Sequence, residues 1–327
     1  LKGVWYTVDD VGLKLLQHDK ALTINFGSIQ QDWLRQLAKL YILVRSNRKL
    51  SISDATHAIT SFNRFSKFIK HKSIFSPSQI NDLLFDEFEY DLKSSNISQV
   101  TIGHYLKHLK SFFDLCREEK WLTVNTYWFK GKSGYHTPNN DEIEYIPQEV
   151  WNQLEKCLKY LPEPQARMIV IIRSMGLRVG ELLNLPFDCL RQRGEKWHLR
   201  FLTEKYQTED ELPISEDLLL IIKEQQQYIK HHFGDNYNYL FSSHVGDRSR
   251  NYTPKPNVME KDVFNDLLNK LAKKHNICTK EGDLWKFKSH QFRRTYATIM
   301  VNAGVRDLTT QKSLRQRSSS MLMHYIH

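Results

Sequence analysis

Residues 164–185 read PQARMIVIIRSMGLRVGELLNL, and this stretch predicts the central helices of the second half of the chain. The segment Pro164–Met175 is apolar nearly all round, which predicts a helix buried in a domain core. Gly176 stands where that helix should end, because glycine readily adopts the left-handed conformation of a C-cap. We expect a second helix over Val179–Leu185, stopped by Pro186. This half of the chain should therefore be built around helices.

The sequence on either side of this core predicts further helices and one hairpin. The expected elements are a helix from Pro147 through Leu158, strands at Trp197–Leu202 and Leu212–Ile214, a third strand at Tyr239–Phe241 and a helix over Val263–His275. The polar stretch Thr203–Glu211 predicts that the hairpin has an open, charged tip. The segment Val245–Pro256 reads as a loop. The fold class is therefore mainly α with a small antiparallel β-sheet.

The first half of the chain predicts four helices after an N-terminal arm or short strand over residues 1–30. They are expected over Asp32–Val44, from a cap at Ser53-Asp54 through Phe68, over Leu83–Leu92 and over Val100–Lys120. The last of these carries a basic stripe opposite its apolar side, made of His104, Lys107, His108 and Lys110. Such a stripe is either an ordinary solvated helix face or a surface that enters a DNA groove.

A domain boundary is expected between Lys130 and Asp141, where the sequence is rich in Gly, Ser, Pro and Asn. We therefore expect a helical domain over residues 31–135, a linker over 136–146 and a second domain over 147–327. Because the chain begins with Leu1 and ends two residues after Tyr325, we also expect that it is truncated at both ends.

The amino-acid composition is typical of a globular protein and excludes a disordered or membrane-spanning one. The chain has 327 residues, of which 40% are hydrophobic, which suits packed domains and is too apolar for disorder. Its 47 Lys and Arg against 37 Asp and Glu give a formal net charge of +10, which favours a polyanionic partner. No apolar run approaches the roughly 18–20 residues of a membrane span, and no secretory signal opens the chain. The four cysteines, which lack metal-ligand spacing, should be buried and reduced: Cys116, Cys157, Cys189 and Cys278.

Positive charge gathers near the C-terminus, where residues 286–327 hold eight Lys and Arg and the one acid Asp307. Within this segment His290 and Arg293 are one helical turn apart, so both side chains should project from one face. Taken alone, this is an ordinary surface pair. Arg178 and Glu181 have the same spacing, and taken alone they are an ordinary intrahelical ion pair.

Taken together and in order, these motifs are specific. Gly-Leu-Arg-x-x-Glu-Leu at 176–182, a hairpin lysine at Lys205, His-x-x-Arg at 290–293 and the late Tyr325 resemble the tyrosine recombinase (phage integrase) family. The resemblance implies a helical, SAM-like core-binding domain followed by a catalytic domain. It also implies DNA cleavage and rejoining through a 3′-phosphotyrosine intermediate, with neither metal nor ATP nor another cofactor.

The resemblance assigns roles that suit the chemistry of a phosphodiester. Arg178 and Arg293 would bind its non-bridging oxygens through planar guanidinium forks. Tyr325 would be the nucleophile. Lys205 would give a proton to the 5′ leaving oxygen, a place that Lys196 fits less well. His290 would act as general acid and base with a near-neutral pKa, and Glu181 would support the domain.

One motif departs from the family. Where members usually show Leu-Gly-His, whose histidine contacts the phosphate, this chain reads Leu314-Arg315-Gln316. We expect Gln316 or the adjacent Arg317 to make that contact. For binding DNA elsewhere, the expected residues are the stripe on the fourth helix together with Lys288, Arg294 and Arg317.

The resulting interpretation is a site-specific recombinase that integrates or excises a mobile element. It would clamp duplex DNA between two domains, act as a homotetramer through a Holliday junction, and work with accessory or directionality proteins in a bacterial cytoplasm. Two alternatives stay open. One is a catalytically weakened DNA-binding relative, suggested by Gln316. The other is a strand transferase of the type IB topoisomerase or telomere-resolving kind.

Overall fold

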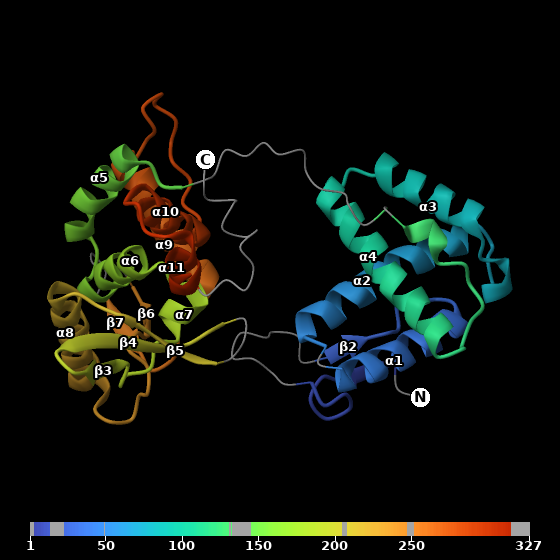
Figure 1. Cartoon of the computed structure of the whole chain (residues 1–327), viewed down its shortest axis with the longest axis horizontal. Helices are drawn as coiled ribbons and strands as arrows, with labels where there is room; N and C mark the ends of the chain where they lie inside the picture. The colour runs from blue at the N-terminus through green and yellow to red at the C-terminus, as the bar shows by residue number, and fades with distance from the viewer. Residues whose placement is uncertain are drawn as a thin grey trace. The chain divides into compact units, whose positions relative to one another are not determined.

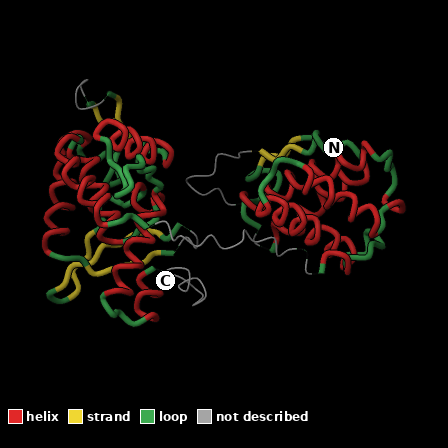
Figure 2. Tube along the Cα trace, turned by 90° about the horizontal axis from the view of Figure 1, so that it is seen from above, coloured by secondary structure: helices red, strands yellow, loops and turns green. Residues whose placement is uncertain are grey.

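The chain folds into two compact units, Leu1–Asn140 and Asp141–His327 (Figures 1 and 2). The computed structural model describes residues 3–13, 23–48, 50–130, 132, 145–204, 208–246 and 252–314. The elements within these ranges are mostly helices, with short antiparallel strands between them. Within the same ranges, no helix combines the length and apolarity needed to span a membrane.

The first unit is a helical domain with a small N-terminal hairpin. Its elements are β1 (Val4–Tyr6), β2 (Thr23–Asn25), α1 (Asp32–Asn47), α2 (Ile52–His71), α3 (Asp82–Ser94) and α4 (Gln99–Glu118). The strands pair antiparallel with Val4 opposite Asn25. The predicted helices are therefore present, and the N-terminal arm contains a hairpin.

Phenylalanines hold α2 and α4 together in the core of this unit. The rings of Phe62 and Phe112 lie 4.7 Å apart, and those of Phe65 and Phe113 lie 6.0 Å apart. Phe85 of α3 joins the cluster, 5.4 Å from Phe113. All five rings are fully buried, and aromatic pairs at these distances stabilise a core beyond the area they bury. The packing fixes which sides of α2 and α4 remain available to a partner.

Side-chain caps set where these helices begin, and one differs from expectation. The predicted cap of α2 at Ser53-Asp54 is wrong, because Ser51 Oγ accepts a hydrogen bond from Asp54 N at 3.0 Å. Ser98 caps α4 in the same way, accepting from Thr101 N at 3.1 Å.

The second unit combines helices with a three-stranded sheet and a short two-stranded hairpin. Its elements are α5 (Gln148–Cys157), α6 (Glu163–Met175), α7 (Val179–Leu183), β3 (Leu190–Arg193), β4 (Lys196–Leu202), β5 (Glu209–Pro213), α8 (Glu216–Phe233), β6 (Ser243–Val245), β7 (Thr253–Lys255), α9 (Lys261–His275), α10 (Ser289–Asn302) and α11 (Asp307–Ser313). Figure 1 shows the sheet at the lower edge of this unit, below α5, α6 and α10.

As predicted, α6 forms the core of the second unit. Met168, Ile169, Ile171 and Ile172 are fully buried, and α6 packs against both α8 and α10. Gly176 ends α6 in the left-handed conformation, with φ +56°. Gly176 also accepts a hydrogen bond from Arg293 on α10, so Arg178, two residues later and directly before α7, begins close to α10.

The predicted sheet is correct in its hairpin and wrong in its third strand. β4 pairs antiparallel with β5, with Leu199 opposite Leu212. The third strand is β3, which lies on the other side of β4, whereas Tyr239 forms an isolated bridge with Pro186. The expected loop at Val245–Pro256 is also wrong in part, because β6 and β7 pair there.

The cysteines follow the prediction with one exception. Cys116, Cys157 and Cys189 are buried free thiols, whereas Cys278 is only half-buried. Burial raises the pKa of the Cys116 and Cys189 thiols to about 12, so both are inert hydrophobic groups at neutral pH.

Candidate active site

The turn between α6 and α7 positions Arg178. Its backbone N–H donates to Glu181 Oε2 at 2.8 Å, and its Nη1 donates to Glu181 Oε1, also at 2.8 Å. The Glu181 carboxylate is fully buried, whereas the Arg178 side chain keeps 21% of its surface exposed. A buried carboxylate thus holds one edge of the guanidinium while the rest can face a ligand. Glu181 therefore orients Arg178, a contact more specific than the general support of the domain that the sequence predicted.

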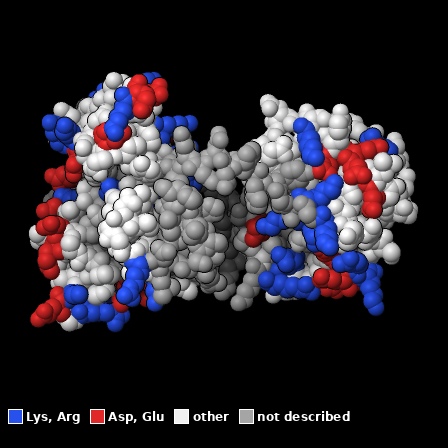
Figure 3. Space-filling view, turned by 45° about the horizontal axis from the view of Figure 1, so that its top comes forward, with Lys and Arg blue, Asp and Glu red and all other residues white. Residues whose placement is uncertain are grey.

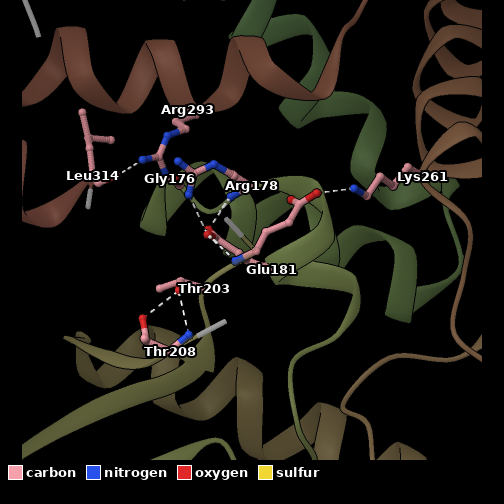
Figure 4. A network of polar contacts seen from close by, with 9 residues as sticks. Gly176, Arg178, Glu181, Thr203, Thr208, Lys261, Arg293 and Leu314 are labelled. Carbon is pink, nitrogen blue, oxygen red and sulfur yellow. Dashed lines mark hydrogen bonds and ion pairs between the residues drawn. The ribbon is translucent and has the colours of Figure 1, made fainter. Parts of the chain in front are cut away.

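Arg293 lies on α10 and is almost completely buried, with 2% of its surface exposed. Its Nη1 donates to the carbonyl of Gly176 at 2.8 Å, and its Nη2 donates to the carbonyl of Leu314. Figure 4 shows Arg293 and Arg178 side by side above Glu181. The interpretation of His290 and Arg293 as an ordinary surface pair is therefore wrong for the arginine.

His290 lies one turn before Arg293, and part of the residue is exposed to solvent while its ring is partly enclosed. Partial burial of its ring and then the positive charges of Arg294, Arg293 and Arg178 lower the pKa of His290 to about 4. The expected near-neutral pKa is therefore wrong for the protein without DNA, in which the imidazole is neutral at pH 7. The same charges show that one electrostatic environment joins α10 to the α6–α7 turn. An anion bound there would raise the pKa of His290 again.

The stem of the β4–β5 hairpin reaches the same cluster. Thr203 and Thr208 close it through Thr203 N to Thr208 O at 2.8 Å and Thr208 N to Thr203 Oγ1 at 3.2 Å. The next residue, Glu204, donates its N–H to Glu181 Oε1 at 3.3 Å. The side chain of Glu204 forms an ion pair with Lys261 at the start of α9. Sequence patterns missed this pair because its members are far apart in the chain.

Four of the predicted site residues lie outside the described residues: Lys205, Gln316, Arg317 and Tyr325. The chain reaches Lys205 directly from Glu204. Gln316 follows two residues after Leu314, whose carbonyl Arg293 binds. Of the predicted DNA contacts near α10, Lys288 is exposed and Arg294 is half-buried.

The predicted basic stripe on α4 is wrong at one position. His104 and Lys107 are exposed, but His108 is buried against α2, and burial followed by the charge of Lys107 lowers its pKa to about 4. Lys110 is partly exposed and forms an ion pair with Asp114.

A basic hollow of about 390 Å³ lies beside this stripe. Its lining combines the C-terminal end of α1 with α4: Arg45, Arg48, Lys107, Lys110, Ser111, Asp114, Leu115 and Glu118. The arginines were missed in the sequence, although their position at the end of a helix places them where cations are favourable. Across the described ranges, no group of three His, Cys, Asp or Glu side chains is arranged to hold a metal ion.

Arg178 is held by the buried Glu181 carboxylate, Arg293 is tied to the same turn through Gly176, and the charges of both arginines act on His290. Residues 144–327 match the phage integrase family, and residues 34–133 match the phage integrase SAM-like domain. The chain therefore belongs to the phage integrase, or tyrosine recombinase, family.

Two curated relatives show the range of similarity. The chain is 28% identical over 308 residues to transposase B from transposon Tn554 of Staphylococcus aureus, which covers 93% of this chain and 47% of that protein. It is 22% identical over 315 residues to tyrosine recombinase XerC of Listeria welshimeri, covering 92% and 93%. The chain thus spans about half the length of transposase B.

Solved structures share the fold. The post-cleavage complex of XerH recombinase with palindromic difH substrate superposes with a TM-score of 0.66 at 12% identity, covering 93% of this chain and 88% of that one. The Tn1549 transposon integrase in complex with circular intermediate DNA gives a TM-score of 0.62 at 17% identity, covering 90% and 95%.

Proposed function

We propose that this protein is a site-specific DNA recombinase that cleaves and rejoins duplex DNA through a 3′-phosphotyrosine intermediate. The observation that supports this most is that Arg178 on Glu181 and Arg293 on the Gly176 carbonyl meet at the α6–α7 turn, and that both charges act on His290. Residues 31–135 would bind the DNA core site, residues 136–146 would link the domains, and residues 147–327 would carry out catalysis.

The proposed cleavage step uses five side chains. The phenol oxygen of Tyr325 bonds to the phosphorus while the bond from phosphorus to the 5′ oxygen breaks. The proton of the phenol passes to the neutral imidazole of His290, and the leaving 5′ oxygen takes a proton from Lys205. Arg178 and Arg293 stabilise the charge that develops on the non-bridging oxygens. Rejoining reverses the step without ATP, because the phosphotyrosine bond keeps the energy of the phosphodiester.

Mobile-element DNA is the substrate we favour. Transposase B from transposon Tn554 is a curated relative, and the Tn1549 transposon integrase shares the fold. We infer that four copies of this chain integrate or excise such an element through a Holliday junction in the bacterial cytoplasm, with directionality or accessory proteins as partners. No cofactor or metal is part of this mechanism.

The test is to find the covalent intermediate. The full chain is incubated with restriction fragments of the genome that encodes it, denatured in detergent, and the protein-linked fragments are sequenced from the attached nucleotide. We expect a 3′-phosphate linkage at a defined site that disappears in Tyr325→Phe and persists in Tyr228→Phe, a control on α8. A linkage to a 5′ phosphate, or one that survives in Tyr325→Phe, contradicts the proposal.

Gln316 favours a second candidate, a DNA-binding relative with weakened catalysis. In that case the wild-type chain binds its site without forming an adduct, and Gln316→His forms one. A topoisomerase-like activity would be recognised instead by relaxation of supercoiled plasmids that lack the mapped site.

A further inference from the structure

Glu204 connects the β4–β5 hairpin to the site by three separate contacts. Its N–H donates to Glu181 Oε1 at 3.3 Å, the same oxygen that accepts from Arg178 Nη1 at 2.8 Å. Its carboxylate binds Lys261 on α9. Figure 4 shows the contacts of Arg178 with Glu181 at one end and the contact of Lys261 at the other. Arg178 and the hairpin stem are therefore held through one shared acceptor.

Gly180 makes the third contact possible. A Cβ at position 180 would lie 2.7 Å from Glu204 Oε2 and 3.1 Å from Lys261 Cε. The Glu204 carboxylate therefore lies directly over the backbone of α7, in space that only glycine leaves open. Both partners keep about a third of their side-chain surface exposed, 28% for Glu204 and 34% for Lys261, so this ion pair is worth little to overall stability.

Because the Glu204–Lys261 ion pair is next to Lys205 in the chain, it can fix the position from which the Lys205 side chain starts. Adjacent Cα atoms are about 3.8 Å apart, so Lys205 begins one residue beyond a point held by α7 and α9. On the other side, the Thr203–Thr208 contacts close the stem of the hairpin. A long, flexible lysine transfers a proton efficiently only when its starting point is fixed relative to the phosphate.

We propose that Glu204 and Lys261 are positioning residues, which hold the hairpin stem against Arg178–Glu181 so that Lys205 reaches the leaving 5′ oxygen. This inference rests on the proposed function, in which Lys205 is the general acid. It predicts that losing the pair slows the protonation of the leaving group and leaves the arginine contacts to the phosphate in place.

Three variants disrupt the Glu204–Lys261 ion pair in different ways. Glu204→Gln and Lys261→Gln each remove one charge of the pair. Gly180→Ala keeps both charges and favours the helix, but its methyl group displaces the Glu204 carboxylate. Glu209→Gln is the matched control, because Glu209 pairs with Arg200 across the same hairpin, with Oε1 2.8 Å from Nη1.

The readout compares two duplexes that carry the cleavage site mapped for the wild-type chain. One has the natural 5′ oxygen at the scissile phosphate and the other has a bridging 5′ sulfur, which leaves as a stable thiolate without needing a proton. General acid catalysis contributes on the order of 10²–10⁴ in rate. We expect the three variants to cleave the oxygen substrate about 10–100-fold more slowly and the sulfur substrate within about 3-fold of wild type.

The outcomes separate the two proposals. Unchanged cleavage of the oxygen substrate by Glu204→Gln and Lys261→Gln, or an equal loss on both substrates, overturns the positioning role. The combined Glu204→Gln/Lys261→Gln variant should lose no more rate than either single variant, because both remove one interaction. A wild-type chain that forms no covalent adduct in the preceding mapping experiment overturns the proposed function itself.

Discussion

Arg293 illustrates how one residue can serve both folding and chemistry. Its guanidinium joins the carbonyl that ends α6 to the carbonyl that follows α11. A guanidinium donates in several directions in one plane, so it can bind two carbonyls and still present N–H groups to an anion. Lysine has three donors on one nitrogen and cannot span the same pair.

We therefore predict that Arg293→Lys lowers both stability and activity. Leaving a buried carbonyl unsatisfied costs about 1–3 kcal/mol, so the free energy of unfolding in urea should fall by about that amount. Covalent adduct formation should fall by at least about 100-fold, the cost of removing one transition-state donor. Arg306→Lys is the control, because Arg306 is exposed. Wild-type levels of adduct in Arg293→Lys would exclude it as a phosphate ligand.

His108 makes the stability of the first unit depend on pH. Its pKa is lowered to about 4 by burial, below the ordinary value of about 6.5. A histidine whose folded-state pKa is lowered favours the folded state above pH 6.5, and this contribution is lost as pH falls toward 4. The neighbouring groups are His57, His104, Lys107 and Asp54, of which only Asp54 favours the charged imidazole.

We predict that this one residue accounts for about 2–3 kcal/mol of the stability lost between pH 7 and pH 4, at about 1.4 kcal/mol for each pKa unit. Urea unfolding at both pH values, followed by tryptophan fluorescence, measures the loss in the wild type. His108→Gln cannot titrate, so its loss should be smaller by that amount, whereas His71→Gln, at an exposed helix end, should behave like wild type. Equal losses in wild type and His108→Gln would refute the assignment.

At the scale of elements, the end of α6 depends on a glycine for two reasons. Gly176 has φ +56°, and a Cβ there would lie 2.6 Å from Cδ1 of Tyr296 on α10. Gly194, in the turn between β3 and β4, has φ +60° but open space around its Cα. A substitution at Gly194 therefore tests backbone strain alone, whereas one at Gly176 tests strain together with a steric clash.

We predict that Gly194→Ala costs about 1 kcal/mol, from left-handed strain alone. Gly176→Ala should cost about 1–3 kcal/mol more, because the methyl group must push Tyr296 and α10 away from the α6–α7 turn. Chemical denaturation of both variants gives the comparison. Equal costs would show that α10 yields freely, which would also argue against a rigid placement of Arg293.

The helices were predicted from the sequence more accurately than the strands, because most helices have a clear periodic pattern of apolar residues and several strands do not. Helices such as α6 and α4 carry their own periodicity, whereas β3 and the β6–β7 hairpin exist because of the strand opposite them, and their sequences show no apolar alternation. No helix was predicted over α8. Its consecutive apolar residues Leu218–Ile222 hide the helical period, and Leu220 is 59% exposed.

In the candidate site too, residues in local sequence motifs could be predicted, whereas contacts between distant segments could not. Helical spacing alone gave only ordinary pairs, and Arg178, Glu181, His290 and Arg293 were selected because the order of their motifs along the chain resembles the tyrosine recombinase family. The burial of His108 could not be predicted, because it depends on how α2 covers α4. The Glu204–Lys261 pair was also out of reach, because its partners are 57 residues apart in the chain.

Across the whole molecule, basic residues occur in both units, in addition to the basic segment at residues 286–327. The net charge of +10 arises from 47 basic and 37 acidic residues, and Figure 3 shows Lys and Arg interleaved with Asp and Glu on the visible faces of both units. Each phosphate that a cation neutralises releases counterions, so DNA affinity should fall steeply as salt rises. Two basic units on one polyanion should contribute separately to that dependence.

We predict that cations in the two units contribute independently to the salt dependence of DNA affinity. Lys107→Gln in the basic hollow of the first unit and Lys288→Gln before α10 should each reduce the slope of log affinity against log salt by about 0.9. The double variant should reduce it by about 1.8, since cations on different units act independently. Lys223→Gln is the control, because Lys223 lies over the Trp197 ring, 5.1 Å from its centroid. Fluorescence anisotropy over a salt series, on duplexes with and without the mapped site, measures each slope. If only Lys107→Gln or only Lys288→Gln changes the slope of log affinity against log salt, then only one of these two lysines contacts phosphate, which contradicts the prediction.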